Sequence, residues 1–93
     1  YWSEPTVYQA KLTVLMKDTP GVLLELLKLL EYLNINLSLL STGHQTVWGW
    51  KDVFVTIDLP NPSKITFILK ELLAKKDICK SVHYTFMDVV ENW

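Results

Sequence analysis

Residues 17–37 read KDTPGVLLELLKLLEYLNINL, a tight turn followed by a helix. The leucines recur at the 3.6-residue spacing of an amphipathic helix, with charged residues between them. Pro20 suits the first helical turn, where its missing N–H costs nothing, and either Asp18 or Thr19 can act as N-cap. We therefore predict a helix near residues 20–34.

The rest of the chain supplies a second helix and four strands. Alternation of apolar and polar residues, as in VYQAKLTVLMK, is typical of half-buried strands. Asn34 suits a left-handed helix stop, and Ser63 suits the N-cap of the second helix. Residues 42–50 are expected to be turn-like. The predicted order is strand 7–17, helix 20–34, strand 35–42, strand 52–59, helix 62–76 and strand 79–87.

Two strand–helix–strand units with right-handed crossovers predict an α+β fold, the ferredoxin-like βαββαβ sandwich. It has a four-stranded antiparallel sheet with both helices on one face, and the second strand lies at a sheet edge. On the uncovered face we expect Leu15, Leu40 and Phe54, which would lie against a partner chain or the rest of a parent protein.

Composition places the chain among soluble globular domains, because 49% of its 93 residues are hydrophobic and 20% are charged. We expect a single domain over residues 1–93, and, since it starts at Tyr1 without a methionine, a fragment of a larger protein. No apolar run is long enough to span a membrane. The lone Cys79 excludes an internal disulfide and favours the cytoplasm. With net charge −1 and no arginine, a nucleic-acid partner is not expected.

The sequence shows no set of catalytic or metal-ligating residues. His44 and His83 are far apart and Cys79 stands alone, so neither a metal nor a cofactor is expected. We expect no enzymatic activity of the domain itself. The Trp48-Gly49-Trp50 segment has two interpretations: an aromatic contact with a partner or ligand, or a hairpin tip that packs on its own strands.

The turn before the first helix is the candidate binding site. A strand that turns into a helix here aims the free N–H groups of Gly21, Val22 and Leu23 at whatever lies above, where the helix dipole adds positive charge. Asp18 could receive an ammonium group, so an amino-acid zwitterion would suit the place. The alternative is that Asp18 or Thr19 caps the helix and Pro-Gly only shapes the turn.

D-x-P-G-V-L, followed by an amphipathic helix and N-I-N-L, resembles the ACT domain, a small-molecule-sensing module of many enzymes of amino-acid metabolism. The similarity spans about residues 8–86. The family binds its ligand between the first strand–helix turn of one subunit and the second strand of its neighbour. By position, the resemblance implies a site formed by Asp18, Thr19, Pro20, Gly21, Val22 and Leu23, with Asn36 reaching across.

Departures from family patterns bear on the ligand and the parent protein. Serine-binding members carry a histidine where this chain has Met16, and LLSTG stands where the prephenate branch has E-S-R. Trp2 and the first strand resemble the C-terminal ACT region of bifunctional alarmone synthetase/hydrolases of the stringent response, whose turn reads D-R-x-G-L-L.

Two functional hypotheses follow from the resemblance and the residues. The first is a regulatory, allosteric module that binds an amino acid or similar effector and controls a tethered enzyme. The second is a dimerisation or protein-interaction module without a ligand. Both include a homodimer formed through strand 35–42, which contains no charge or proline to discourage edge pairing.

Overall fold

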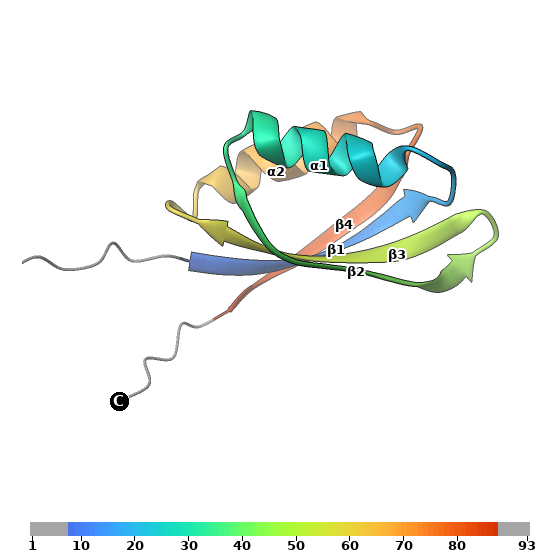
Figure 1. The fold of residues 1–93 in the computed structure, drawn as a ribbon, viewed down its shortest axis with the longest axis horizontal. Helices are drawn as coiled ribbons and strands as arrows, with labels where there is room; N and C mark the ends of the chain where they lie inside the picture. The colour runs from blue at the N-terminus through green and yellow to red at the C-terminus, as the bar shows by residue number, and fades with distance from the viewer. Residues whose placement is uncertain (1–7, 88–93) are drawn as a thin grey trace, which may run out of the picture.

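The computed structural model describes residues 8–87 as four strands and two helices. Figure 1 shows both helices on one side of the sheet, with the opposite face uncovered. This arrangement confirms the predicted ferredoxin-like βαββαβ sandwich. The elements are β1 (Tyr8–Lys17), α1 (Val22–Tyr32), β2 (Asn36–Val47), β3 (Trp50–Leu59), α2 (Lys64–Ala74) and β4 (Cys79–Met87).

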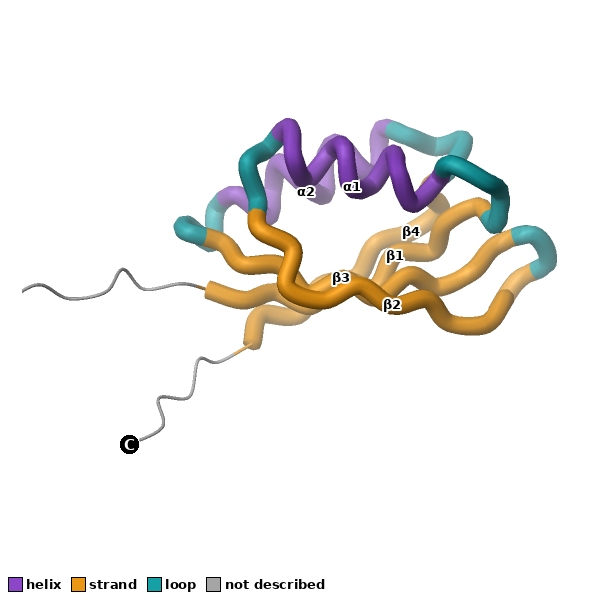
Figure 2. The backbone as a smooth tube through the Cα atoms, in the orientation of Figure 1, coloured by secondary structure: helices purple, strands orange, loops and turns teal. Residues whose placement is uncertain are grey.

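The sheet is antiparallel throughout, with the strand order β2-β3-β1-β4. β1 and β3 pair along their whole length, from Tyr8 opposite Leu59 to Lys17 opposite Trp50. Figure 2 shows the strands as one twisted layer beneath the two helices. β2 therefore lies at a sheet edge, as predicted.

The core lies between the helices and the covered face of the sheet. Alternate residues of β1 and β3 meet one apolar stripe from each helix, which is what the periods of two and 3.6 residues predict. No helix within residues 8–87 has both the length and the apolar character needed to span a bilayer. The buried residues of the helices are Val22, Leu26, Leu29, Leu30, Ile65, Ile68 and Leu72.

Both helices are shorter than predicted. They begin at Val22 and Lys64, two residues later than expected, and they end at Tyr32 and Ala74. Asn34 follows α1 with φ 57°, which confirms the predicted left-handed stop. The hydroxyl of Ser63, at the N-cap of α2, makes no capping hydrogen bond with the helix.

The N-cap of α1 is Gly21, not Asp18 or Thr19 as predicted. Gly21 has φ 87°, a conformation that glycine adopts without the steric cost borne by other residues. The turn thus extends two or three residues further along the chain than the sequence prediction allowed. No side chain caps the helix, so the first-turn N–H groups of α1 keep their donor capacity.

The prediction of a turn over residues 42–50 is wrong. β2 continues to Val47 and β3 begins at Trp50, so the turn consists of Trp48 and Gly49 alone. Pairing with β3 imposes the strand on residues 43–47, although a glycine and several polar residues make that stretch a poor strand by composition. The tip is exposed: Trp48 has 92% of its surface accessible, whereas Trp50 lies beneath Lys80, with 5.0 Å from Nζ to the ring centroid.

A bulge in β2 reverses the predicted faces of that strand. Leu37 lies opposite Ile57 and Leu39 opposite Thr56, so Ser38 is the extra residue. Beyond it, Leu39 lies on the uncovered face and is 57% exposed. Leu40 packs against the core instead. The prediction that Leu40 belongs to the uncovered face is therefore wrong.

Candidate functional site

The turn between β1 and α1 is held by the backbone of the neighbouring hairpin. The Asp18 N–H donates to the Gly49 carbonyl at 2.9 Å, and the Thr19 N–H donates to the Lys17 carbonyl at 3.0 Å. The first helical bond runs from the Glu25 N–H to the Gly21 carbonyl at 3.1 Å. The bond to Gly49 holds the turn directly beside the tip of the β2–β3 hairpin.

The Asp18 carboxylate is engaged by two side chains that sequence reasoning missed. Gln45 Nε2 donates to Oδ2 at 2.7 Å, and Lys51 Nζ lies 3.2 Å from Oδ1. The hydrogen bond from Gln45, followed by the interaction with Lys51, lowers the pKa of Asp18. The ammonium group beside Asp18 thus belongs to the chain itself. Gln45 was hidden because it falls in the segment predicted to be a turn.

A hollow of about 300 Å³ opens over this turn. Val22 contributes no side chain to it, because that side chain is buried in the core, and only its backbone is near the turn. Five of the seven predicted site residues line the hollow, and Lys51 adds a positive charge. The lining residues are Asp18, Thr19, Pro20, Gly21, Leu23 and Lys51.

Asn36 lies at the opposite end of the sheet within one chain. Its Nδ2 donates to Asp58 Oδ2 at 2.6 Å, and Gln9 donates to the other oxygen at 2.8 Å. Gln9 precedes Lys17, the last residue of β1, by eight positions, which at about 3.3 Å per residue is roughly 26 Å of strand. A single chain does not bring Asn36 to the Asp18 turn.

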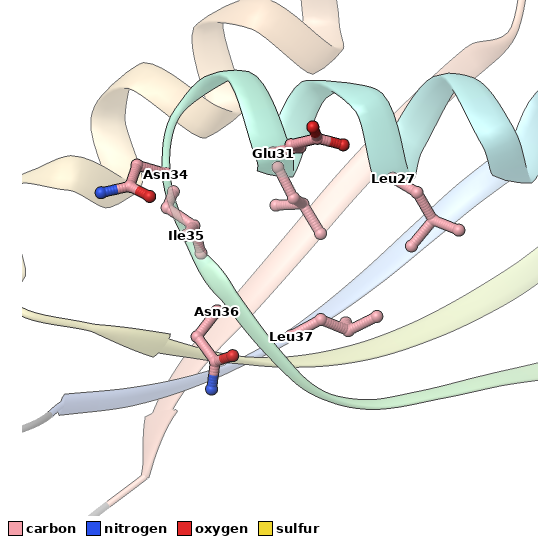
Figure 3. Close-up of a pocket in the computed structure, with 7 residues that line it drawn as sticks. Leu27, Glu31, Asn34, Ile35, Asn36 and Leu37 are labelled. Carbon is pink, nitrogen blue, oxygen red and sulfur yellow. The ribbon is translucent and has the colours of Figure 1, made fainter.

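A second hollow, of about 380 Å³, lies where α1 ends and β2 begins. Figure 3 shows Leu27 and Leu37 between the helix and the strand, with Asn36 on the other side of the strand. Glu31 contributes a charge at the rim, and the rest of the lining is apolar or amide. This hollow flanks the free edge of β2.

Two other residues considered in the sequence, Met16 and Cys79, are buried in the core. Met16 is fully buried, so the residue at the histidine position of serine-binding ACT domains faces the core. Cys79 is buried as well, and this burial raises the pKa of its thiol, which keeps it protonated. Within residues 8–87, no three His, Cys, Asp or Glu side chains gather in a way that could hold a metal ion.

The hydrogen bond from Gln45 to Asp18 can be tested by titration. The pKa of Asp18 should lie below that of an ordinary aspartate, and Gln45→Leu should raise it, because the bond favours the charged carboxylate. The pair thus stabilises the fold at neutral pH, and this contribution is lost as the pH falls through the lowered pKa. The measurement is the carboxyl carbon shift in NMR. Gln9→Leu, at the far end of the sheet, should leave Asp18 unchanged; an unaltered pKa in Gln45→Leu would contradict the assignment.

No protein-family model matches the chain, and no curated protein sequence matches it. Solved structures do share its fold. The ACT domain of GTP pyrophosphokinase from Chlorobium tepidum has a TM-score of 0.68 at 16% identity, over 86% of this chain and 100% of that one. The C-terminal domain of MgtC from Mycobacterium tuberculosis has a TM-score of 0.71 at 13% identity, over 92% and 94%.

A third similar structure is the ligand-free regulatory subunit of aspartate kinase from Thermus thermophilus. Its TM-score is 0.67 at 14% identity, over 86% of this chain and 53% of that subunit. The present chain therefore spans about half of that subunit. These likenesses confirm, at the level of the fold, the resemblance to ACT domains that the sequence indicated.

Proposed function

We propose that this chain, whose fold is that of ACT domains, is a regulatory module that binds an amino acid or a similar small molecule between two copies. The bound effector would control an enzyme of the same parent protein, in amino-acid metabolism or alarmone synthesis, and the domain itself would have no catalytic activity. The hollow at the β1–α1 turn carries this proposal, because it joins uncapped helix N–H groups to the Lys51 charge. Fold neighbours from GTP pyrophosphokinase and aspartate kinase support it.

The arrangement of charges suggests how a zwitterion would lie. Its carboxylate would face the backbone N–H groups of Gly21 and Val22 and the ammonium of Lys51. Asp18 already carries two partners, so it positions Lys51 instead of receiving the amine. The Asn36 nitrogen donates to Asp58, which leaves its oxygen to accept a hydrogen bond from the amine.

The second copy would supply Asn36. The regular part of β2 between the first two of its three register shifts runs over residues 39–42. Antiparallel pairing of two β2 edges about Leu40 keeps paired residues on one face and places position 36 of one chain opposite position 44 of the other, next to Gln45. Gln45 hydrogen-bonds Asp18, so Asn36 of the second chain would reach the turn hollow. Pairing of this kind joins two half-sites into one.

The proposal is tested by titrating the folded domain with the common amino acids and following the backbone amide shifts. The amide shifts of Gly21 and Val22 should change first and saturably. Lys51→Met should weaken binding about fivefold or more, because losing one charged contact costs about 1 kcal/mol of binding free energy. Lys70→Met, an equally drastic change on the exposed side of α2, should not. Saturable binding with unmoved Gly21 and Val22 would contradict this site.

The alternative is a dimerisation or interaction module without an effector. The buried Met16 and the occupied Asp18 carboxylate favour it, because both remove groups that a ligand could use. Under this alternative, sedimentation would show a dimer while no amino acid moves any amide of the turn. Either role fits the cytoplasmic location that the lone Cys79 favours.

A further inference from the structure

The uncovered face of the sheet contains a hollow of about 340 Å³ that none of the predicted site residues lines. It spans three adjacent strands, β2, β3 and β1, near their middle. Its volume lies at the lower end of the roughly 300–1,000 Å³ of ordinary ligand pockets. The side chains that form it on this face are Lys11, Thr13, Leu39, Ser41, Phe54 and Thr56.

Small hydroxyl residues form the floor of this hollow and larger side chains form its walls. Thr56 lies between Leu39 and Lys11 in the register, and Phe54 lies between Ser41 and Thr13. Thr56 is only 8% exposed although no helix covers this face, because its taller neighbours shelter it. The depression follows from this alternation of side-chain height across the strands.

The aromatic wall packs against a glycine. A Cβ atom at Gly43 would lie 3.0 Å from Cε2 of Phe54, so the ring rests against the bare backbone of β2. A larger residue at this position would push the ring toward the hollow. Phe54 is thereby held as a preformed apolar surface, which lowers the cost of ordering it when a ligand binds.

The charge at the rim comes from Lys11. Within residues 8–87 there is one ion pair, between Lys51 and Asp18. The Lys11 ammonium therefore has no carboxylate partner in that part of the chain. Asp58, on the same face, is held by Gln9 and Asn36. With Asp52 also on this face, the described strands form no basic track for a phosphate backbone. The hollow therefore offers one positive charge, several hydroxyls and an apolar wall.

We propose that this hollow binds a compact monocarboxylate with an aromatic or branched aliphatic group. The carboxylate pairs with Lys11 and accepts hydrogen bonds from the hydroxyls of Thr13 and Thr56, while the apolar group covers Phe54 and Leu39. The site is independent of the turn hollow, which lies at the end of β1, and it holds in a single chain.

Phenylacetate is the probe, and its uncharged isostere phenylacetamide is the control. Titrated into the folded domain, phenylacetate should shift the amides of Thr13, Phe54 and Thr56 with a Kd on the order of 1 mM, as expected for a small ligand in an open site. Phenylacetamide should bind about fivefold more weakly, because it loses the binding free energy of one exposed ion pair, about 1 kcal/mol. Gly21 should stay unmoved.

Two lysine variants decide the role of the charge. Lys11→Gln should weaken phenylacetate about fivefold and leave phenylacetamide unaffected. Lys28→Gln, an exposed lysine of α1 in the opposite layer, should change neither. Amide dispersion shows that each variant is folded.

Three outcomes would overturn the proposal. The first is the absence of saturable shifts up to about 20 mM phenylacetate, well above the expected Kd. The second is equal binding by Lys11→Gln and Lys28→Gln. The third is movement confined to Gly21 and Val22, which would assign the carboxylate to the turn and leave the proposed function standing.

Discussion

Leu26→Ala should lower the free energy of unfolding by about 3 kcal/mol, within the roughly 2–5 kcal/mol measured for such core truncations. Leu26 is 1% exposed and lies at the centre of the α1 stripe that faces the sheet. Removing its side chain leaves a cavity between a helix and a sheet, both of which are held by their other contacts. The loss is a large share of the stability of a domain of this size, about 5–15 kcal/mol.

The control lies two residues away in the same helix. Leu24 is 55% exposed, so Leu24→Ala removes the same atoms without opening a cavity and should change the free energy of unfolding by less than about 0.5 kcal/mol. Urea denaturation followed by circular dichroism measures both. Equal losses in the two variants would contradict the assignment of Leu26 to the core.

This pair of variants also bears on the binding site. α1 begins at the Gly21 turn, and no side chain caps it, so packing of its buried stripe is what holds the first-turn N–H groups in place. A loosened helix in Leu26→Ala should therefore weaken any ligand of the turn hollow, whereas Leu24→Ala should not. The structural and functional effects share one physical cause.

Periodicity accounts for what the sequence predicted well. The spacing of apolar residues identified both helices, the buried faces of β1 and β3 and the bounds of β4, because burial against a common core imposes these periods. The strand order then followed from the connections. The left-handed Asn34 was also predictable, since its preference is local.

Features that depend on contacts between distant residues were not predictable. The bulge at Ser38 shifts the faces of β2, and a local pattern in a strand of mostly leucine and serine does not reveal it. The partners of Asp18 come from β2 and β3, so the side chain expected to cap a helix or to bind an amine is instead paired within the chain. The contacts of Asp18 with Gln45 and Lys51 thus override its local preference to cap the helix.

Leu39→Lys should convert the proposed β2-paired dimer into a folded monomer. β2 is a free edge, and over residues 36–47 it contains no charged residue and no proline. The bulges near Ser38 and after Thr42 give some protection, but the stretch between them is regular and can pair with a second copy. An exposed lysine on each of two antiparallel edges places like charges close to one another, which disfavours pairing.

The position of the lysine matters. Leu40 is partly buried against the core, so Leu40→Lys would partly desolvate a charge and destabilise the fold, whereas the exposed Leu39 tolerates the change. Phe67, on α2 and away from the edge, is 60% exposed, and Phe67→Lys is the matched control that should remain dimeric. Loss of the dimer should also weaken amino-acid binding at the turn, because Asn36 comes from the other chain in the proposed site.

Sedimentation velocity measures the outcome directly. A protein concentration of about 100 μM suits it, because this lies within the micromolar-to-millimolar range of dissociation constants expected for such a dimer. The unmodified chain and Phe67→Lys should sediment as dimers, and Leu39→Lys should sediment as a monomer with an unchanged amide spectrum away from β2. A monomeric unmodified chain at that concentration would remove the edge-paired dimer and the shared site together. A dimer that persists in Leu39→Lys would place the interface elsewhere, and Asn36 would then have no route to the Asp18 turn, because the length of the sheet separates the two residues within one chain.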